Sequence, residues 1–327
     1  MAVGVCSHAA LRAATDGPSP QTVSAEYDLL LRGGHIVDGT GNPWFRGDLA
    51  IEGDRIARIA PRIDARARRV IDLEGQVIAP GFIDLHTHAI RGLFEVPTAE
   101  NYVRQGVTTI MEGPDGSSPL PLSDFLDRVV RTRTSVNVGV FVGQGSIRAQ
   151  VMGPVDRPAT PGELGEMLAL VREAMRQGAF GMSTGLLYVP GTFTPTAEVI
   201  ELARVAGELG GIHTSHMRDE ASGILDSVRE TIAIGEQGHL PTHITHHKIV
   251  GLPNWGKSVE SLALVAEARA RGVDVTVDQY PYTAASNGIR ALLPRWALEG
   301  GRQRLLDRLR DPATRDRVRR ETAERIR

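Results

Sequence analysis

Residues 79–88 read Ala-Pro-Gly-Phe-Ile-Asp-Leu-His-Thr-His, and the fold prediction starts from this segment. An apolar run entered through Pro-Gly is typical of a buried strand, and residues at i and i+2 of a strand point to the same face. We therefore expect His86 and His88 to project toward one point. Neutral imidazole is a common ligand of zinc and similar ions, so this pair is a candidate for half of a metal site.

Apolar runs rich in β-branched residues alternate with amphipathic segments after residue 79. The alternation predicts repeated βα units and a parallel sheet. Because polar residues follow the predicted strands, and barrels place their sites at that end, we predict an α/β fold: a (β/α)8 TIM-type barrel with about seven strands present and strand eight lacking. The predicted strands are 82–88, 107–111, 136–142, 178–183, 211–216, 242–246 and 273–278, and the predicted helices are 123–132, 162–177, 197–209, 222–237 and 259–271.

The pattern differs at the two ends of the chain. Residues 1–25 are small and polar and are predicted to be a flexible leader. Residues 26–78 show short strands separated by Gly and Asp turns, which predicts a small antiparallel β-sandwich portion before the barrel at 79–327. The region after Gly300 is rich in arginine with acids interleaved, which favours a solvated helical pair on the barrel exterior over a basic binding patch. The predicted short strands are 27–31, 35–38, 48–52, 55–59 and 70–73.

Composition excludes several classes of function. The chain has 327 residues and a net charge of −2, so no electrostatic argument supports a nucleic acid or anionic membrane partner. No apolar run reaches the roughly 18 residues of a spanning helix. The single cysteine, Cys6, allows no disulfide within the chain, and a cytoplasmic location is the default. We expect a small-molecule substrate, and nothing in the sequence indicates a protein partner.

Histidines cluster where the predicted strands end: seven of the ten lie in 86–88, 213–216 and 243–247. Of His213 and His216, three residues apart, only one can face the barrel axis, and His216 is nearer the carboxyl end of its strand. His246 is favoured over His247 as a ligand. The remaining histidines of these segments, His213, His243 and His247, are interpreted as supporting or packing residues.

Six segments, read in order, resemble the amidohydrolase superfamily and its N-acyl-D-amino-acid deacylase (D-aminoacylase) family. They are PGFIDLHTH, GVTTIMEGPDG, GAFGMSTGLLYVPG, HTSHMRDE, THHKIVGLPNWGK and VDQYPYTA. The resemblance implies a metal-dependent barrel that hydrolyses N-acyl-D-amino acids to a carboxylate and a free D-amino acid. It also implies a β-sandwich built from both chain ends.

The resemblance implies a set of site residues. His86, His88, His216 and His246 would bind one or two divalent ions, with zinc expected. Asp115 stands where the family usually has a bridging cysteine in a Gly-Asn-Cys-Gly turn; a carboxylate is a competent ligand, and the alternative is a turn residue in Pro-Asp-Gly.

The resemblance also bears on a residue behind the metal ligands and on the general base. Gln144 stands where the family often has a histidine. The family's general base is an aspartate at the end of strand eight, so we expect it beyond Arg327, and Asp278, Asp219 and Glu220 are not assigned as bases.

Substrate recognition should use cations and phenols on the same loops. Lys248 and Arg218 are candidates for the amino-acid carboxylate. Tyr188, Tyr280 and Tyr282 could donate to that carboxylate or to the acyl oxygen, and the alternative for the last two is packing around the proline between them.

Other classes stay open at this point. Hydantoinases, dihydroorotases and ureases share the His-x-His opening but bridge two metals with a carboxylated lysine on strand four, where residues 178–184 contain no lysine. Another cyclic amidase or a deaminase of the superfamily is the first alternative. A truncated, non-catalytic barrel is the second, because strand eight is lacking and two residues depart from the family pattern. A binding module of unrelated fold is the least favoured.

Overall fold

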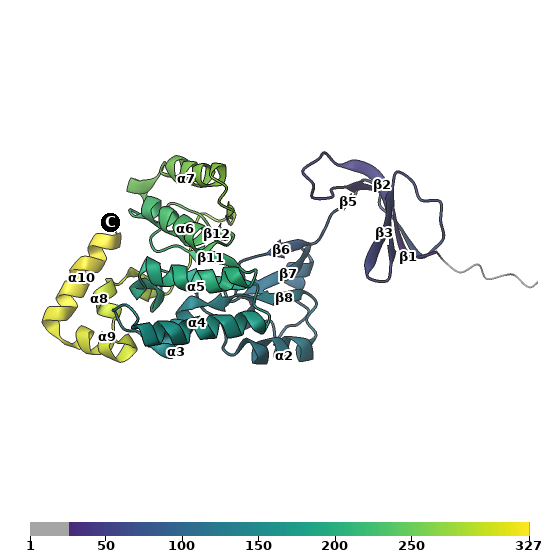
Figure 1. Ribbon diagram of the computed structural model, residues 1–327. Coiled ribbons are helices and arrows are strands. Elements are labelled where there is room, and N and C mark those ends of the chain that lie inside the picture. The colour runs from purple at the N-terminus through teal and green to yellow at the C-terminus, as the bar shows by residue number, and fades with distance from the viewer. Residues whose placement is uncertain (1–25, 327) are drawn as a thin grey trace, which may run out of the picture. The chain divides into compact units, whose positions relative to one another are not determined.

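The computed structural model describes residues 26–326, and the chain divides into two compact units, Met1–Pro80 and Gly81–Arg327 (Figure 1). The predicted leader, residues 1–25, lies outside the described residues.

The first unit contains one mixed five-stranded sheet rather than the predicted antiparallel arrangement. Two predicted strands, 27–31 and 35–38, are one long strand with a register shift between Leu31 and Gly34. Strand β1 pairs antiparallel with β2 but parallel with β4 and β5, and β2 pairs antiparallel with β3. The bounds are β1 (Tyr27–Ile36), β2 (Phe45–Glu52), β3 (Arg55–Ala60), β4 (Ala67–Asp72) and β5 (Val77–Ile78).

The second unit contains the parallel strands that the sequence predicts, paired in chain order. One sheet has the order β6-β7-β8 and the other the order β13-β12-β11-β10-β9. Only Phe141 separates β8 from β9, so these two are the halves of one predicted strand, which pairs first with β7 and then with β10. The bounds are β6 (Phe82–Asp84), β7 (Val107–Glu112), β8 (Asn137–Val140), β9 (Val142–Gly143), β10 (Gly181–Gly185), β11 (Ile212–His216), β12 (Thr242–Ile244) and β13 (Val275–Val277).

Helices connect these strands. The five predicted helices begin and end within two residues of their predicted bounds. Helix α4 begins with a capping box: Thr160 accepts from the Glu163 amide, and the Glu163 side chain accepts from the Thr160 amide. The helices are α1 (Glu100–Val103), α2 (Leu122–Thr132), α3 (Gln144–Val151), α4 (Pro161–Arg176), α5 (Thr196–Glu208), α6 (Ile224–Gly238) and α7 (Ser258–Ala270), with short 3-10 turns η1 (Ala89–Arg91), η2 (Gly191–Phe193), η3 (Leu252–Asn254) and η4 (Ile289–Leu292).

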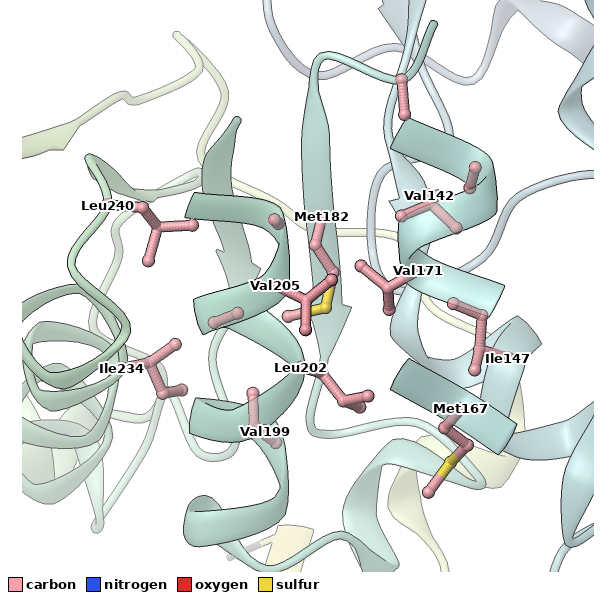
Figure 2. Close-up of a cluster of buried hydrophobic side chains, with 14 of the residues drawn as sticks. Val142, Ile147, Met167, Val171, Met182, Val199, Leu202, Val205, Ile234 and Leu240 are labelled. Carbon is pink, nitrogen blue, oxygen red and sulfur yellow. The ribbon is translucent and has the colours of Figure 1, made fainter. Parts of the chain in front are cut away.

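The main core lies between the parallel strands and the helices outside them. In Figure 2, Met182 of β10 points toward Val205 of α5 and Val171 of α4, and all three are buried. Strands of a parallel sheet are covered by helices, so these apolar contacts hold α4 and α5 against β10, while parallel pairing with β9 and β11 aligns the strand ends. The core thus holds the carboxyl ends of adjacent strands in one place.

The chain after Gly300 forms a pair of helices, as predicted: α9 (Gly301–Arg310) and α10 (Pro312–Ile326). The short helix α8 (Arg295–Leu298), which was not predicted, precedes them. These helices are not only solvated, because Leu305 and Val318 are buried with Phe193 in a small cluster. Within the described residues, no helix is both long enough and apolar enough to cross a membrane.

Candidate metal centre

Asp115 lies in a sharp turn directly after β7. Its φ is +56°, a left-handed conformation that aspartate tolerates better than most residues. The Ser183 hydroxyl holds this turn, accepting from the Gly116 amide at 3.1 Å and donating to the Gly113 carbonyl at 2.6 Å. A side chain at Gly116 would collide with the backbone of Gly185 in β10, so the turn packs directly on the neighbouring strand.

Four imidazoles surround the Asp115 carboxylate. The Nε2 atoms of His86 and His88 lie 3.5 Å from Oδ1 and 3.3 Å from Oδ2 of Asp115. His216 Nδ1 and His246 Nε2 lie 3.5 Å and 3.8 Å from Oδ1. These ligand-type side chains come from the ends of four different strands. The structure therefore brings all five predicted metal-binding residues to one point.

The strand-face argument for the first two histidines was wrong in detail. Strand β6 ends at Asp84, so His86 and His88 lie in the turn that follows it. Buried Glu112 holds this turn: its Oε1 accepts from the Thr87 hydroxyl at 2.6 Å and from the Ala89 amide at 2.8 Å. The histidines converge because a carboxylate anchors their loop, not because a strand aligns them.

His246 is fixed from two sides. Its φ is +39°, which is unusual for a residue other than glycine, and its amide donates to Asp278 Oδ1. Its Nδ1 lies 3.1 Å from the buried carboxylate of Glu220, while its Nε2 faces Asp115. A carboxylate on one ring nitrogen is the usual partner of a metal-ligating histidine, because it sets the tautomer and the ring orientation. Strained backbone of this kind is common at functional sites.

The charges of the cluster are strongly coupled. Burial raises the pKa of Asp115, but the four imidazoles beside the carboxylate lower it more, so that it lies well below its usual range. Asp115 raises the pKa of His88. Burial lowers the pKa of His246, yet Asp115 and Glu220 raise it more, to about 9. The carboxylate is therefore negative at neutral pH and attracts cations.

The donor set fits divalent ions. Two groups of three, His86-His88-Asp115 and Asp115-His216-His246, each place their ligand atoms within 4.8 Å of one another and share the carboxylate. Three buried polar atoms of the cluster have no hydrogen-bond partner: His86 Nδ1, Asp115 Oδ1 and His216 Nε2. An unpartnered buried carboxylate oxygen is costly, and a cation between it and the imidazoles would satisfy it. Imidazole and carboxylate ligands suit zinc.

A cavity of about 910 Å³ opens over the cluster. Lys248, Tyr188, Tyr280 and Tyr282 all line it, as does Asp115. The Lys248 ammonium is paired with Glu220 and lies 3.0 Å from His246 Nδ1. The Tyr188 hydroxyl lies 3.4 Å from His216 Nδ1 and donates to Asn287 at 2.9 Å. Four of the five predicted substrate-binding side chains therefore face the same space.

Arg218 is the exception. It does not line the cavity, and its guanidinium is paired with Glu230 at 2.8 Å while donating to the carbonyls of Thr192 and Thr194 at 3.1 and 2.9 Å. With these donors used, the guanidinium ties the loop at 192–194 to α6. The geometry gives no support to the substrate contact predicted for it.

The other three histidines of the strand-end segments, and Gln144, have partners outside the cluster. Fully buried His213 lies between Thr184 and Thr242 at 2.9 and 2.8 Å. His243 Nε2 lies 3.0 Å from Asp278 and His247 Nε2 lies 2.9 Å from Ser261. Gln144 is buried and donates to Thr194 at 3.0 Å.

Sequence reasoning missed the roles of Glu112 and Glu220. Glu112 ends the apolar run of β7, and a carboxylate at the carboxyl end of a buried strand was an available signal. Glu220 was given no role from the sequence, and in the structure it pairs with Lys248 and His246. No sequence spacing indicates which cation a loop carboxylate will meet.

A profile of the amidohydrolase family matches residues 69–254 of this sequence. The chain belongs to that family. It is 40% identical over 293 residues to a D-aminoacylase of Alcaligenes xylosoxydans xylosoxydans, a match that covers 83% of this chain and 60% of the relative.

Solved structures show the same similarity. An N-acyl-D-glutamate deacylase from Bordetella bronchiseptica, in complex with zinc and a phosphonate inhibitor, matches with a TM-score of 0.74 and 36% identity over 78% of this chain and 59% of that one. A D-aminoacylase structure from work on the functional role of its binuclear metal center matches with a TM-score of 0.76 and 38% identity, covering 82% of this chain and 62% of that one. The chain thus spans about 60% of the length of the relatives it matches.

Proposed function

We propose that this protein is a metal-dependent hydrolase that cleaves the amide bond of N-acyl-D-amino acids and releases a carboxylate and a free D-amino acid. The observation that carries the proposal is the Asp115 carboxylate among four imidazoles, in a cavity that Asp115 and Lys248 both line. Similarity of 36–40% to proteins named as D-amino-acid deacylases supports the substrate class. Absence of lysine from β10 speaks against the subtype with a carboxylated lysine.

The proposal assigns roles to residues of this chain. His86, His88, Asp115, His216 and His246 would hold one or two zinc ions, with Asp115 shared between them. The chemistry that a bound divalent ion supplies is activation of a water molecule and polarisation of the acyl carbonyl. Because both groups of three residues include Asp115, the two sets of ligand atoms surround the same carboxylate.

Other residues orient the ligands and the substrate. Glu220 keeps Nδ1 of His246 engaged, so that Nε2 faces the centre. Lys248 would bind the carboxylate of the amino acid, and the Tyr188 hydroxyl would donate to the acyl oxygen or to that carboxylate. Among the described residues Asp115 is the only carboxylate that lines the cavity, so we propose that the general base comes from outside them. Asp278 would act by positioning, since its oxygens already bind His243 and the His246 amide.

The architecture is part of the same proposal. We propose that the parallel strands of residues 79–327 are those of a (β/α)8 barrel, and that the sheet of residues 26–78 is one portion of a β-sandwich. Support comes from the chain-order pairing of β6 to β13 and from the TM-scores with D-amino-acid deacylases. We further propose a cytoplasmic location, on the single cysteine of the sequence.

Direct assay tests the proposal. The zinc-loaded protein is expected to release D-methionine from N-acetyl-D-methionine, with the L-enantiomer as the matched control. Hydrolysis of a cyclic amide or release of ammonia from a ring, without D-amino acid release, would assign it to another amidase or deaminase. No turnover by a folded, zinc-loaded protein would reject the proposal.

Zinc affinity should depend on pH because protons compete for the same nitrogens. A ligating imidazole must be neutral, and the pKa of His246 without metal is about 9. Affinity should therefore rise by about tenfold per unit between pH 7 and 8.5 for this one proton and level off above pH 9. Chelator competition across this range measures it. An affinity that is flat from pH 7 to 8.5 would contradict the assigned ligand.

Substitution of Lys248 separates binding from chemistry. Lys248→Ala should raise KM for N-acetyl-D-methionine by about 10- to 100-fold, because a charge-assisted contact to the substrate carboxylate is lost, while kcat changes less. The other lysine of the sequence, Lys257, does not line the cavity, and Lys257→Ala serves as the control. A loss confined to kcat with full zinc content would reassign Lys248 to catalysis.

A further inference from the structure

A buried carboxylate lies behind the loop that carries His86 and His88. Glu112 ends β7 with 1% of its surface exposed, and its Oε1 accepts from the Thr87 hydroxyl at 2.6 Å and from the Ala89 amide at 2.8 Å. The first donor lies between the two histidines and the second directly follows them. Glu112 therefore holds the loop on both sides of His88, although it belongs to neither group of ligand atoms.

The imidazoles of the two groups differ in how firmly packing holds them. The side chain of His88 is 50% exposed, whereas those of His216 and His246 are 3% and 11% exposed. Because a half-exposed ring has few neighbours, the position of its nitrogen depends on the backbone that carries it. His246 also has Glu220 against its Nδ1 at 3.1 Å. The second group is thus supported by burial and by Glu220, and the first depends on Glu112.

The main chain of Glu112 is held independently of its side chain. The Phe141 amide donates to the Glu112 carbonyl at 2.9 Å, and Glu112 pairs in register with Val140 of β8. The turn that carries Asp115 has its own hydrogen bonds to the Ser183 hydroxyl. A change of the Glu112 side chain should therefore release the histidine loop and leave Asp115 in place.

We propose that Glu112 is a positioning residue for one half of the metal centre. Its side chain governs ion binding by His86 and His88, and it leaves the half with His216 and His246 unchanged. This inference rests on the proposed function. Loss of an outer partner of a metal ligand weakens metal binding by about 10- to 100-fold. Here the partner holds a loop rather than a ring nitrogen, so the effect falls on both histidines of that loop.

Zinc binding by a pair of variants tests the inference. Chelator competition gives the number of ions bound and the Kd of each, and anomalous density from zinc-loaded crystals assigns each ion to its half. Glu112→Ala should weaken the ion at His86 and His88 by about 10- to 100-fold and the other ion by less than about threefold. Glu112→Gln keeps an acceptor oxygen on a side chain of the same shape and should restore most of the affinity.

Two further variants separate positioning from general loss of stability. Asp48 of β2 is 4% exposed and accepts from the Gly33 and Ile63 amides at 2.7 and 2.8 Å. Asp48→Ala should therefore lower the free energy of unfolding without changing the Kd of either ion. Thr87→Val removes the hydroxyl but keeps the shape of the side chain, and it should weaken the same ion as Glu112→Ala. It takes the place of that variant if the alanine prevents folding.

Three results would overturn the inference: equal weakening of both ions in Glu112→Ala, an unchanged Kd at His86 and His88, or a parent protein that binds no ion there. Weakening in Glu112→Gln as large as in Glu112→Ala would overturn it too, because the hydrogen bonds would then not be the cause. Selective loss of this ion in a protein that releases no D-amino acid would instead reject the hydrolase and leave the role of Glu112 standing.

Discussion

Asp115→Asn should lose metal and activity together, with metal affinity falling by more than the 10- to 100-fold typical of an outer-sphere change, and kcat/KM by about a thousandfold or more. The amide keeps the size of the side chain but removes the negative charge that faces four imidazoles. Zinc content by elemental analysis and D-amino acid release measure the two effects.

This substitution separates the two interpretations of Asp115. Asparagine adopts the left-handed conformation at φ +56° about as readily as aspartate, so the turn itself should survive. Asp127→Asn, on the exposed side of α2, is the matched control for loss of one carboxylate. If Asp115→Asn kept full zinc and turnover, Asp115 would be only a turn residue and the shared-carboxylate centre would be wrong.

Arg148→Ala should lower the free energy of unfolding by about 3–5 kcal/mol, because it leaves a carboxylate buried without its partner. Arg148 of α3 is fully buried and paired with Glu198 of α5, and it also donates to the Arg157 carbonyl at 2.6 Å. The other oxygen of Glu198 accepts from the Ala159 amide at 3.0 Å. Since Ser146 and Ala149 of α3 line the cavity, this pair also holds one of its walls.

Urea unfolding measures the effect, and two variants control it. Arg157→Ala breaks a solvent-exposed pair with Glu163 and should lower the free energy of unfolding far less than Arg148→Ala does. The double variant Arg148→Met with Glu198→Leu replaces the buried charges by apolar groups and should recover much of the loss. A single variant as stable as the parent protein would show that Arg148 is not needed to hold α3 against α5.

Much of the fold could be predicted because burial leaves a strong pattern. The β-branched runs between amphipathic helices gave the parallel strands, including the interrupted one around Phe141. The pairing of the first sheet could not be predicted, because β4 and β5 choose β1 as a parallel partner through contacts distant in sequence. Local propensity indicates a strand but not the direction of its neighbour.

The candidate site, too, could be predicted only in part. Histidine clustering at strand ends indicated the residues that meet Asp115, and the structure brings all four imidazoles to it. Which carboxylate supports which imidazole could not be predicted, since Glu112 and Glu220 act across loops. Arg218 differs: its position next to the cluster in sequence suggested a substrate contact, but Glu230 and two carbonyls take its donors, so the geometry does not support that contact.

The position of the metal tests the account most directly. Crystals of the zinc-loaded protein, measured on both sides of the zinc absorption edge, should give anomalous density in contact with Asp115 and the surrounding imidazoles, as one peak or as two that share the carboxylate. Density absent from this cluster at full zinc loading, or bound at another place in the chain, would contradict the metal centre and with it the proposed hydrolase.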